Sequence, residues 1–180
     1  MTQPVDPSPR SDAQHRMGRG MIYVAWLLAL GLVTWLFSGW LDTQRNPNRH
    51  VKSVIEDGMY AVTLERNRYG HYNANGLING REVEFMLDTG ATTVSVPAAV
   101  AQRLGLKRGP PVLSSTANGT ITTYLTRLAS VSVGDITLHN VKANINPHMG
   151  GNEVLLGMSF LKHLEFTQRG DTLILKQLPQ

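Results

Sequence analysis

The feature that most restricts how this 180-residue chain folds is a stretch of 21 residues, 21–41, that contains no charged side chain. At the helical rise of about 1.5 Å per residue it covers roughly 31 Å, which matches the hydrocarbon core of a bilayer. Tyr23 and Trp40 lie near its ends, where aromatic rings favour the membrane interface. Because a helix that is apolar all round is not expected on a soluble surface, residues 21–41 are predicted to be a single transmembrane helix.

A cleavable signal peptide is the main alternative for this stretch. Its apolar region normally has about 7–15 residues and precedes a cleavage site of small residues. Here the run is longer and continues into Ser38-Gly39-Trp40-Leu41-Asp42, which lacks that pattern. A retained anchor is therefore predicted, although arginines on both sides of the run leave its orientation open.

The anchor divides the rest of the chain into three parts. Residues 1–20 are polar and rich in proline, which is typical of a disordered tail. Residues 42–57 are also polar and are predicted to be a tether between membrane and domain, with self-cleavage inside the tether as a hypothesis. Residues 58–180 are long enough for one ordinary folded domain.

The domain has the pattern of a mainly β protein. Asn79-Gly80 and Asn118-Gly119 are strong hairpin signals, and Pro97 can begin a short helix over 98–104 that Gly105 closes in the left-handed conformation. A second short helix is predicted near 161–163. The predicted strands are 59–67, 71–78, 81–87, 92–96, 112–117, 120–128, 128–133, 136–145, 164–167 and 172–178, with an apolar run at 154–161.

The two halves of the domain follow a similar order. Residues 80–104 run from a glycine turn through a strand and a loop to an apolar strand and a helix, and residues 134–163 repeat that order. No alternation of strands with long helices appears, so a parallel α/β fold is not expected. The order favours a barrel with an internal pseudo-two-fold axis.

Asp88 is the residue whose position most needs an explanation. Val83, Phe85 and Leu87 alternate with other residues as in a strand with one buried face, and Asp88 follows directly. Because an acid is depleted in strands and costly to bury, it is either a turn acid that caps a hairpin or a carboxylate with a chemical role. Gly90 is predicted to make the sharp reversal behind it with a positive φ angle.

Three motifs resemble those of one protein family. They are Leu87-Asp88-Thr89-Gly90-Ala91-Thr92-Thr93, Thr116-Ala117-Asn118-Gly119, and Leu155-Leu156-Gly157-Met158-Ser159-Phe160-Leu161. The first and third in this order are specific together, whereas the second alone is weak. Over residues 59–178 the chain resembles the retropepsin-like aspartic proteases of clan AA, in particular their membrane-anchored bacterial members with a single span.

The resemblance implies a fold and a set of residue roles. The fold is mainly β, a closed antiparallel retropepsin-like acid-protease barrel with one or two short helices, preceded by the single transmembrane helix. Asp88 would be the catalytic acid, and Thr89 would make hydrogen bonds across a dimer. The active-site loop would continue through Gly90 and Ala91, backed by Leu155, Leu156 and Gly157. A flap over the substrate would contain Thr116, Ala117, Asn118 and Gly119.

The chemistry of such a site needs two carboxylates. Placed close together, they share one proton and activate a water molecule to attack a peptide carbonyl. This chain has one Asp-Thr-Gly, and neither Asp135 nor Asp171 has the apolar lead-in or the following Thr-Gly. A homodimer that acts on a peptide or protein substrate, with Asp88 from each copy, is therefore predicted. The strand at 173–178 is expected to contribute to the dimer sheet.

Several classes of function are disfavoured by the sequence. Cysteine is absent, so disulfides, thiolate zinc sites and cysteine nucleophiles are excluded. The six histidines lack metal-ligand spacing, so neither a metal nor a cofactor is predicted. Lys and Arg are scattered along the sequence, which predicts no nucleic-acid partner.

Two non-catalytic alternatives remain open. One is a membrane-tethered β-barrel that binds a peptide or protein without cleaving it, and the other is a membrane-tethered scaffold dimer. On the resemblance, the expected location is the bacterial inner membrane, with the catalytic domain on the periplasmic side.

Overall fold

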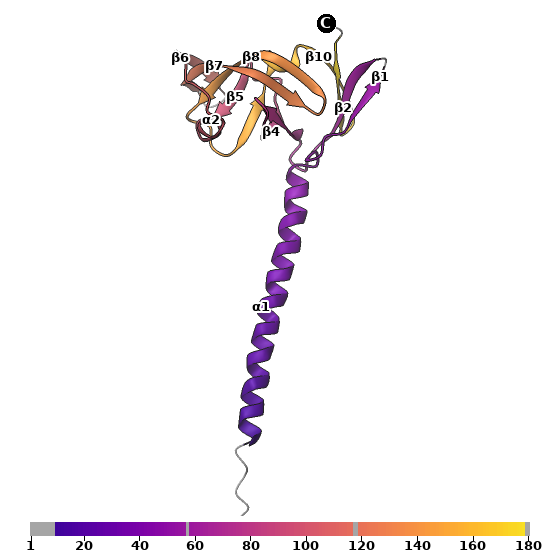
Figure 1. Cartoon of the computed structure of the whole chain (residues 1–180), viewed down its shortest axis with the longest axis vertical. Helices are drawn as coiled ribbons and strands as arrows, with labels where there is room; N and C mark the ends of the chain where they lie inside the picture. The colour runs from indigo at the N-terminus through magenta and orange to yellow at the C-terminus, as the bar shows by residue number, and fades with distance from the viewer. Residues whose placement is uncertain (1–9, 57, 117–118, 179–180) are drawn as a thin grey trace, which may run out of the picture. The chain divides into compact units, whose positions relative to one another are not determined.

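The chain divides into two compact units, Met1–Asp42 and Thr43–Gln180. The computed structural model describes residues 10–56, 58–116 and 119–178 (Figure 1). Helix α1 (Arg10–Arg45) accounts for the described part of the first unit. It begins within the predicted disordered tail, because Pro9 is the last proline of that tail and residues such as Ala13, Gln14 and Met17 favour helix. Residues 1–9 of the predicted tail lie outside the described residues.

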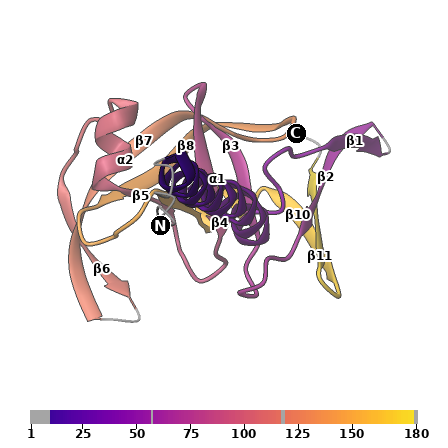
Figure 2. The ribbon, with the colours of Figure 1, turned by 90° about the horizontal axis from the view of Figure 1, so that it is seen from below.

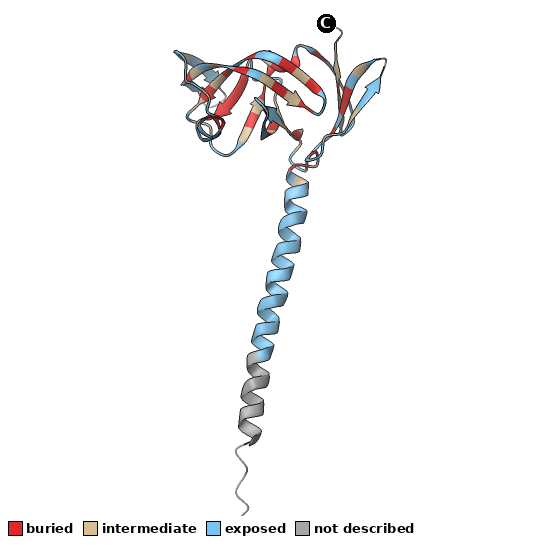
Figure 3. Ribbon diagram, in the orientation of Figure 1, coloured by how far each residue is buried: buried red, intermediate tan, exposed pale blue. Residues whose placement is uncertain are grey.

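The apolar part of α1 exposes its side chains. All described side chains over residues 21–42 are exposed, including those of Trp26 and Trp35 (Figure 3). Among the described residues, one helical segment, Met21–Arg45, is long and apolar enough to cross a membrane. A signal sequence satisfies the same criteria of length and composition.

The described residues of the second unit after α1 form eleven strands and two short helices. In chain order they are β1 (Ser53–Glu56), β2 (Met59–Glu65), β3 (Asn73–Ile78), β4 (Arg81–Leu87), β5 (Val94–Pro97), α2 (Ala98–Leu104), β6 (Pro111–Thr116), β7 (Gly119–Val133), β8 (Ile136–Asn146), β9 (Glu153–Leu156), α3 (Met158–Leu161), β10 (Leu164–Arg169) and β11 (Thr172–Gln177). One sheet has the order β1-β2-β11-β10, and the other has the order β3-β4-β9-β5-β8-β7-β6. Figures 1 and 2 place α2 and β6 at one end of this unit and β1 at the other.

The larger sheet bends into a barrel, which confirms the mainly β fold class. Strand β3 pairs with β7 as well as with β4, so the strand pairings form a ring. The pairing around the ring is short at two places. Strands β5 and β9 pair through a single residue pair, Ser95 with Leu155, and β3 and β7 pair through two residue pairs. The barrel is therefore closed less completely than the sequence prediction stated.

Two of the strand pairs are parallel and the other pairs between the strands are antiparallel, which agrees with a mostly antiparallel barrel. Strand β4 pairs with β9, and β5 pairs with β8, in parallel. The internal repeat gives the reason. In the repeat, β4, β5 and α2 of the first half correspond to β8, β9 and α3 of the second half. Exchanging the two halves therefore turns the parallel pair β4–β9 into the parallel pair β8–β5. The antiparallel contact between β5 and β9 maps onto itself, so it lies at the pseudo-two-fold axis.

Local sequence signals explain several element boundaries. Asn79 and Gly80 have φ angles of 51° and 76°, as the predicted type I′ turn requires. Helix α2 covers the predicted residues, and Gly105 ends it with φ 70°. By contrast, the segments predicted as strands 120–128 and 128–133 form one strand, β7, that pairs with β6 over its first part and with β8 from Tyr124 onwards. The second short helix lies at Met158–Leu161, slightly before its predicted position.

The core of the domain is drawn from both sheets. Its largest fully buried side chains include Phe85 on β4 and Phe160 on α3, beside aliphatic residues of β7, β8 and β11. Figure 3 shows these buried residues alternating with exposed ones along the strands, as the two-residue period of a strand requires. This packing fixes β4 and β9, which carry the loop that contains Asp88 and its support.

The predicted tether is part of the folded unit rather than a free linker. The buried Asn48 side chain donates to the carbonyls of Glu65 and Asn73, at 2.8 and 2.7 Å, and accepts from the amide of Glu65 at 2.7 Å. Arg45 forms an ion pair with Glu153 at 2.6 Å. Strand β1 lies farther along the same stretch and pairs with β2. The polar side chains that predicted a solvated linker therefore satisfy buried backbone groups.

Candidate active site

Asp88 directly follows strand β4 and lies at the edge of a cleft. The strand is held between β3 and β9, and its last residue, Leu87, donates its amide to the carbonyl of Tyr72 at 3.0 Å. The amide of Asp88 then donates to the carbonyl of Leu156 at 3.2 Å. Asp88 itself is half-buried, so its backbone is fixed while its carboxylate remains accessible.

The turn after Asp88 orients the carboxylate. The amide of Gly90 donates to Oδ1 of Asp88 at 2.8 Å, and the amide of Ala91 donates to the Asp88 carbonyl at 3.2 Å. Donation to Oδ1 stabilises negative charge on that oxygen and leaves Oδ2 for a reacting group. Gly90 is not among the residues with positive φ, which corrects the predicted reason for this glycine. A Cβ there would lie 3.1 Å from Oδ1 of Asp88, so a side chain would crowd the carboxylate.

The start of α3 holds the far side of this loop. Met158 donates its amide to the carbonyl of Ala91 at 2.8 Å, and Ser159 donates its amide to the carbonyl of Thr92 at 3.0 Å. The Ser159 hydroxyl also accepts from the amide of Val94 at 3.0 Å. Because each peptide unit from Ala91 to Val94 has a fixed contact, the loop is preorganised.

Gly157 allows the loop to pack this closely. A Cβ at this position would lie 2.4 Å from the carbonyl oxygen of Thr93 and 2.6 Å from that of Ala91. The structure thus places Leu156 and Gly157 directly behind the Asp88 loop, and Leu155 lines the cleft beside it.

Asn144 supports the loop from a third direction. Its side-chain amide donates to the hydroxyl of Thr93 at 3.0 Å, and its Oδ1 accepts from the hydroxyl of Ser95 at 2.8 Å. All three residues line the cleft. Asn144 was not predicted from the sequence, because a polar residue in a strand is no signal until its partner is known.

The cleft has a volume of about 700 Å³ and lies between the Asp88 loop and the hairpin of β6 and β7. Its loop side contains Asp88, Gly90 and Ala91, and its hairpin side contains Thr116. The Thr116 hydroxyl donates to the carbonyl of Gly119 at 2.8 Å, next to the tip. Of the predicted flap residues, Ala117 and Asn118 lie outside the described residues.

Thr89 lies on the other side of Asp88 and does not line this cleft. It is exposed, and its hydroxyl makes no hydrogen bond within the described part of the chain. With Tyr72 and Phe166 it borders a separate hollow of about 290 Å³. The Tyr72 hydroxyl is buried there without a hydrogen-bond partner among the described residues. The loop therefore presents Asp88 to the cleft and Thr89 to a different surface.

Three comparisons with known proteins show what this chain is similar to. The profile of the family described as "gag-polyprotein putative aspartyl protease" matches residues 74–163. An uncharacterised protein of Sinorhizobium sp., encoded in the cobV 5′ region, is 30% identical over 91% of this chain and 76% of its own length. An uncharacterised protein of Rickettsia prowazekii is 29% identical over 63% of this chain and 50% of its own length. The crystal structure of a retropepsin-like aspartic protease from Rickettsia conorii is similar with 29% identity and a TM-score of 0.55, covering 70% of this chain and 95% of that one.

Proposed function

Because this chain belongs to the family of retropepsin-like aspartic proteases, we propose that it is an aspartic endopeptidase in which Asp88 of two copies activates water to cleave a peptide bond. The observation that carries the proposal is the position of Asp88. It directly follows β4, its Oδ1 is oriented by the amide of Gly90, and it faces a cleft that a hairpin borders.

The chemistry follows from a pair of such carboxylates. Held close together, one is ionised and the other protonated. The ionised carboxylate removes a proton from water as the oxygen attacks the peptide carbonyl, and the protonated one donates to the carbonyl oxygen. The leaving amine takes a proton as the carbon–nitrogen bond breaks. In this arrangement, the contact from Gly90 keeps Asp88 in one orientation while its Oδ2 exchanges protons.

The second carboxylate is proposed to come from a second copy of the chain. The internal repeat offers no substitute, because the loop between β8 and β9, residues 147–152, contains no acid. Thr89 supports the homodimer, since its exposed hydroxyl is available for the hydrogen bond across the interface that the family resemblance assigns to it.

The strand expected to contribute to the dimer sheet, β11, lies inside a sheet of its own chain. It is paired with β2 and with β10. One edge of strand β11 is therefore covered by the β1–β2 hairpin, and its other edge is covered by β10. The free edges of that sheet are β1 and β10, and β10 contributes Phe166 and Gln168 to the hollow beside Thr89.

The cleft is suited to an extended peptide. Its hairpin side combines apolar Leu113 and Ile121 with hydroxyl groups of Ser115 and Thr116. Leu113 is 78% exposed, which leaves it free to contact a substrate side chain. The proposed flap is the β6–β7 hairpin, with its tip at Thr116 and Gly119.

The helix α1 is proposed to be a retained membrane anchor. Its apolar side chains are exposed over 21–41, and the chain after it is tied into the domain by Asn48. The bacterial inner membrane is proposed from the family resemblance, and two relatives come from the bacteria Sinorhizobium and Rickettsia. The periplasmic location of the catalytic domain rests on the family resemblance alone.

The experiment is cleavage of a peptide library by the full chain in neutral detergent micelles, at about pH 4 to 7, where a carboxylate pair holds a single proton. Wild type is compared with Asp88→Asn, which keeps an acceptor for the amide of Gly90. Asp135→Asn, at an exposed turn, is the matched control. We expect cleavage by wild type and the control, none by Asp88→Asn, and inhibition by pepstatin.

The contrary outcomes are distinct. Cleavage retained by Asp88→Asn would overturn the assignment of the catalytic acid. A wild-type protein that is folded and dimeric but cleaves no peptide would support the binding barrel instead. Loss of specific activity on dilution would support the dimer.

A further inference from the structure

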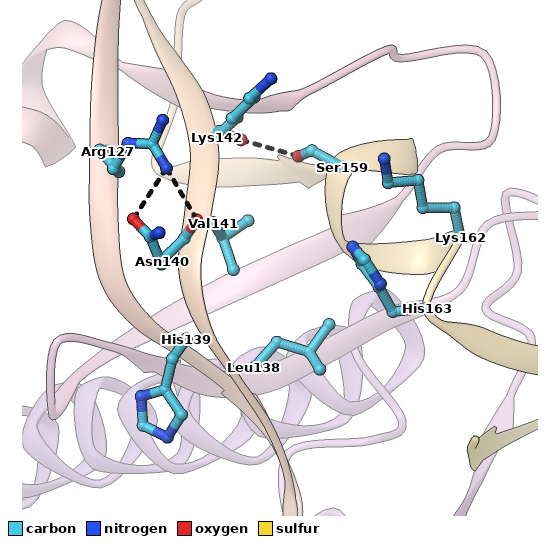
Figure 4. A pocket seen from close by; sticks show the side chains of 9 residues that line it. All are labelled: Arg127, Leu138, His139, Asn140, Val141, Lys142, Ser159, Lys162 and His163. Atoms are coloured by element: carbon cyan, nitrogen blue, oxygen red, sulfur yellow. Dashed lines mark hydrogen bonds between the residues drawn. The ribbon is translucent and has the colours of Figure 1, made fainter. Parts of the chain in front are cut away.

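A second hollow, of about 320 Å³, lies on the outer surface of the β7–β8 hairpin beside α3 (Figure 4). It shares no lining residue with the cleft that contains Asp88. Leu138 and Val141 form its apolar floor, and charged side chains surround them. It is therefore distinct from the cleft, and Ser159, which holds the Asp88 loop, is the lining residue that lies between the two.

The charges around this hollow are all of one sign. Arg127, Lys142 and Lys162 line it together with His163, and no acid lines it. None of the three cations forms an ion pair within the described part of the chain. The sequence reflects this bias, because Asp135 is the sole acid between Asp88 and Glu153 whereas that stretch holds five Lys and Arg. The fold brings cations that are far apart in the sequence together around this hollow.

The strand register places two of these cations directly opposite each other. Arg127 on β7 pairs with Lys142 on β8, so both side chains leave the same face of the sheet. Like charges at directly opposite positions destabilise a sheet. An anion bound between them would remove that repulsion.

Asn140 holds the guanidinium of Arg127 in position. Asn140 has φ 59° in the middle of β8, a left-handed conformation that is uncommon outside glycine. Nη1 of Arg127 donates to its Oδ1 at 2.8 Å and to its carbonyl at 3.4 Å, as Figure 4 shows. Among the described residues the other guanidinium nitrogens have no such partner. Asn adopts this conformation more readily than most residues, and here it holds a cation that lines the hollow.

We propose that this hollow binds a phosphate monoester. Such a group carries nearly two negative charges at neutral pH and three acceptor oxygens. The guanidinium fork of Arg127 suits two of those oxygens, while Lys142 and Lys162 act as point charges from the two sides. His163 extends from the end of α3 towards the same space (Figure 4). The phosphate belongs either to a soluble molecule or to a lipid headgroup, and the chemistry of recognition is the same.

The test measures inorganic phosphate binding by calorimetry, with the full chain in nanodiscs of phosphatidylcholine at low salt. The double variant Arg127→Gln with Lys162→Gln removes two charges from the hollow. The control, Lys52→Gln with Arg169→Gln, removes two charges from exposed residues that do not line it. We expect the pocket variant to bind phosphate at least about tenfold more weakly than wild type, and the control to remain within about twofold.

Nanodiscs that contain phosphatidic acid distinguish the two sources. If a lipid headgroup occupies the hollow, the apparent phosphate affinity falls in these nanodiscs; if the ligand is soluble, the affinity does not change. Either result supports the site. Absence of phosphate binding to wild type in phosphatidylcholine, or equal losses in the two double variants, would overturn the proposal. Neither result depends on peptide cleavage, so the site is tested separately from the protease function.

Discussion

The carbonyl oxygen of Ala91 occupies the space where a side chain at position 157 would begin, because a Cβ on Gly157 would lie 2.6 Å from it. No real side chain packs at that distance against a backbone oxygen. The loop that contains Asp88 therefore depends on the absence of a side chain many residues farther along the chain.

Gly157→Ala is expected to destabilise the domain and displace the Asp88 loop. Overpacking against fixed backbone should lower the free energy of unfolding by about 1–3 kcal/mol. Urea unfolding of the full chain in micelles measures the change. Gly150→Ala is the matched control, since nothing lies within 4 Å of a Cβ there, and it should change stability by less than about 0.5 kcal/mol. Equal effects of the two changes would contradict the packing argument.

Asn48→Asp tests whether the stretch after α1 is part of the fold. The change keeps the size of the side chain but removes the donor that satisfies the carbonyls of Glu65 and Asn73. We expect a loss of about 2–4 kcal/mol in the free energy of unfolding. Asn152→Asp, at an exposed loop position, should be nearly neutral. A neutral Asn48→Asp would restore the interpretation of residues 42–57 as a free tether.

Thr89→Val tests the proposed interface. The variant keeps the shape of the side chain and removes a hydroxyl that has no partner within the described chain. The free energy of unfolding measured at high dilution should not change. As the protein is diluted, the variant should lose its specific activity at a protein concentration about tenfold or more higher than the one at which wild type loses it. Activity measured over a dilution series gives this midpoint. Thr63→Val, exposed on β2, should leave the midpoint unchanged, and equal midpoints for all three proteins would remove Thr89 from the interface.

Leu113→Asp tests whether the β6–β7 hairpin contacts substrate. Because Leu113 is exposed, the change should leave the free energy of unfolding nearly unaltered. It should raise KM for apolar peptides about tenfold by removing an apolar contact and placing an acid in the cleft. Leu77→Asp, a partly exposed leucine of β3 outside the cleft, serves as the control. An unchanged KM for Leu113→Asp would mean that the hairpin does not touch substrate.

Features set by neighbouring residues were predictable from the sequence. The Asn79-Gly80 turn, the strand that leads to Asp88 and helix α2 with its Gly105 cap all follow from local conformational preferences. The repeat of order in the two halves also indicated a pseudo-two-fold barrel. Family resemblance added the residues behind the loop, which local preferences do not give.

Features set by distant partners were not predictable. The parallel pairing of β4 with β9 joins residues far apart in the sequence, and no local pattern specifies it. Gly76 lies within the predicted strand 71–78, and its missing Cβ lets the carbonyl of Ser132 approach where β3 meets β7. Asn48 looked like a linker residue because its buried partners become neighbours only after folding. The cluster around Arg127 was hidden for the same reason.

The hydrogen bond from Asp88 to Leu156 also sets an order of events during synthesis. A ribosome releases residue 88 well before residue 156, so the loop lacks its backing while the intervening strands emerge. Contacts between such distant residues form late, because a long segment must first be closed. The nascent chain therefore carries its acid in an unformed site and has no competent loop until almost all of the domain has left the ribosome. Under the proposed function, a newly made molecule cannot cleave its neighbours before its own fold is complete.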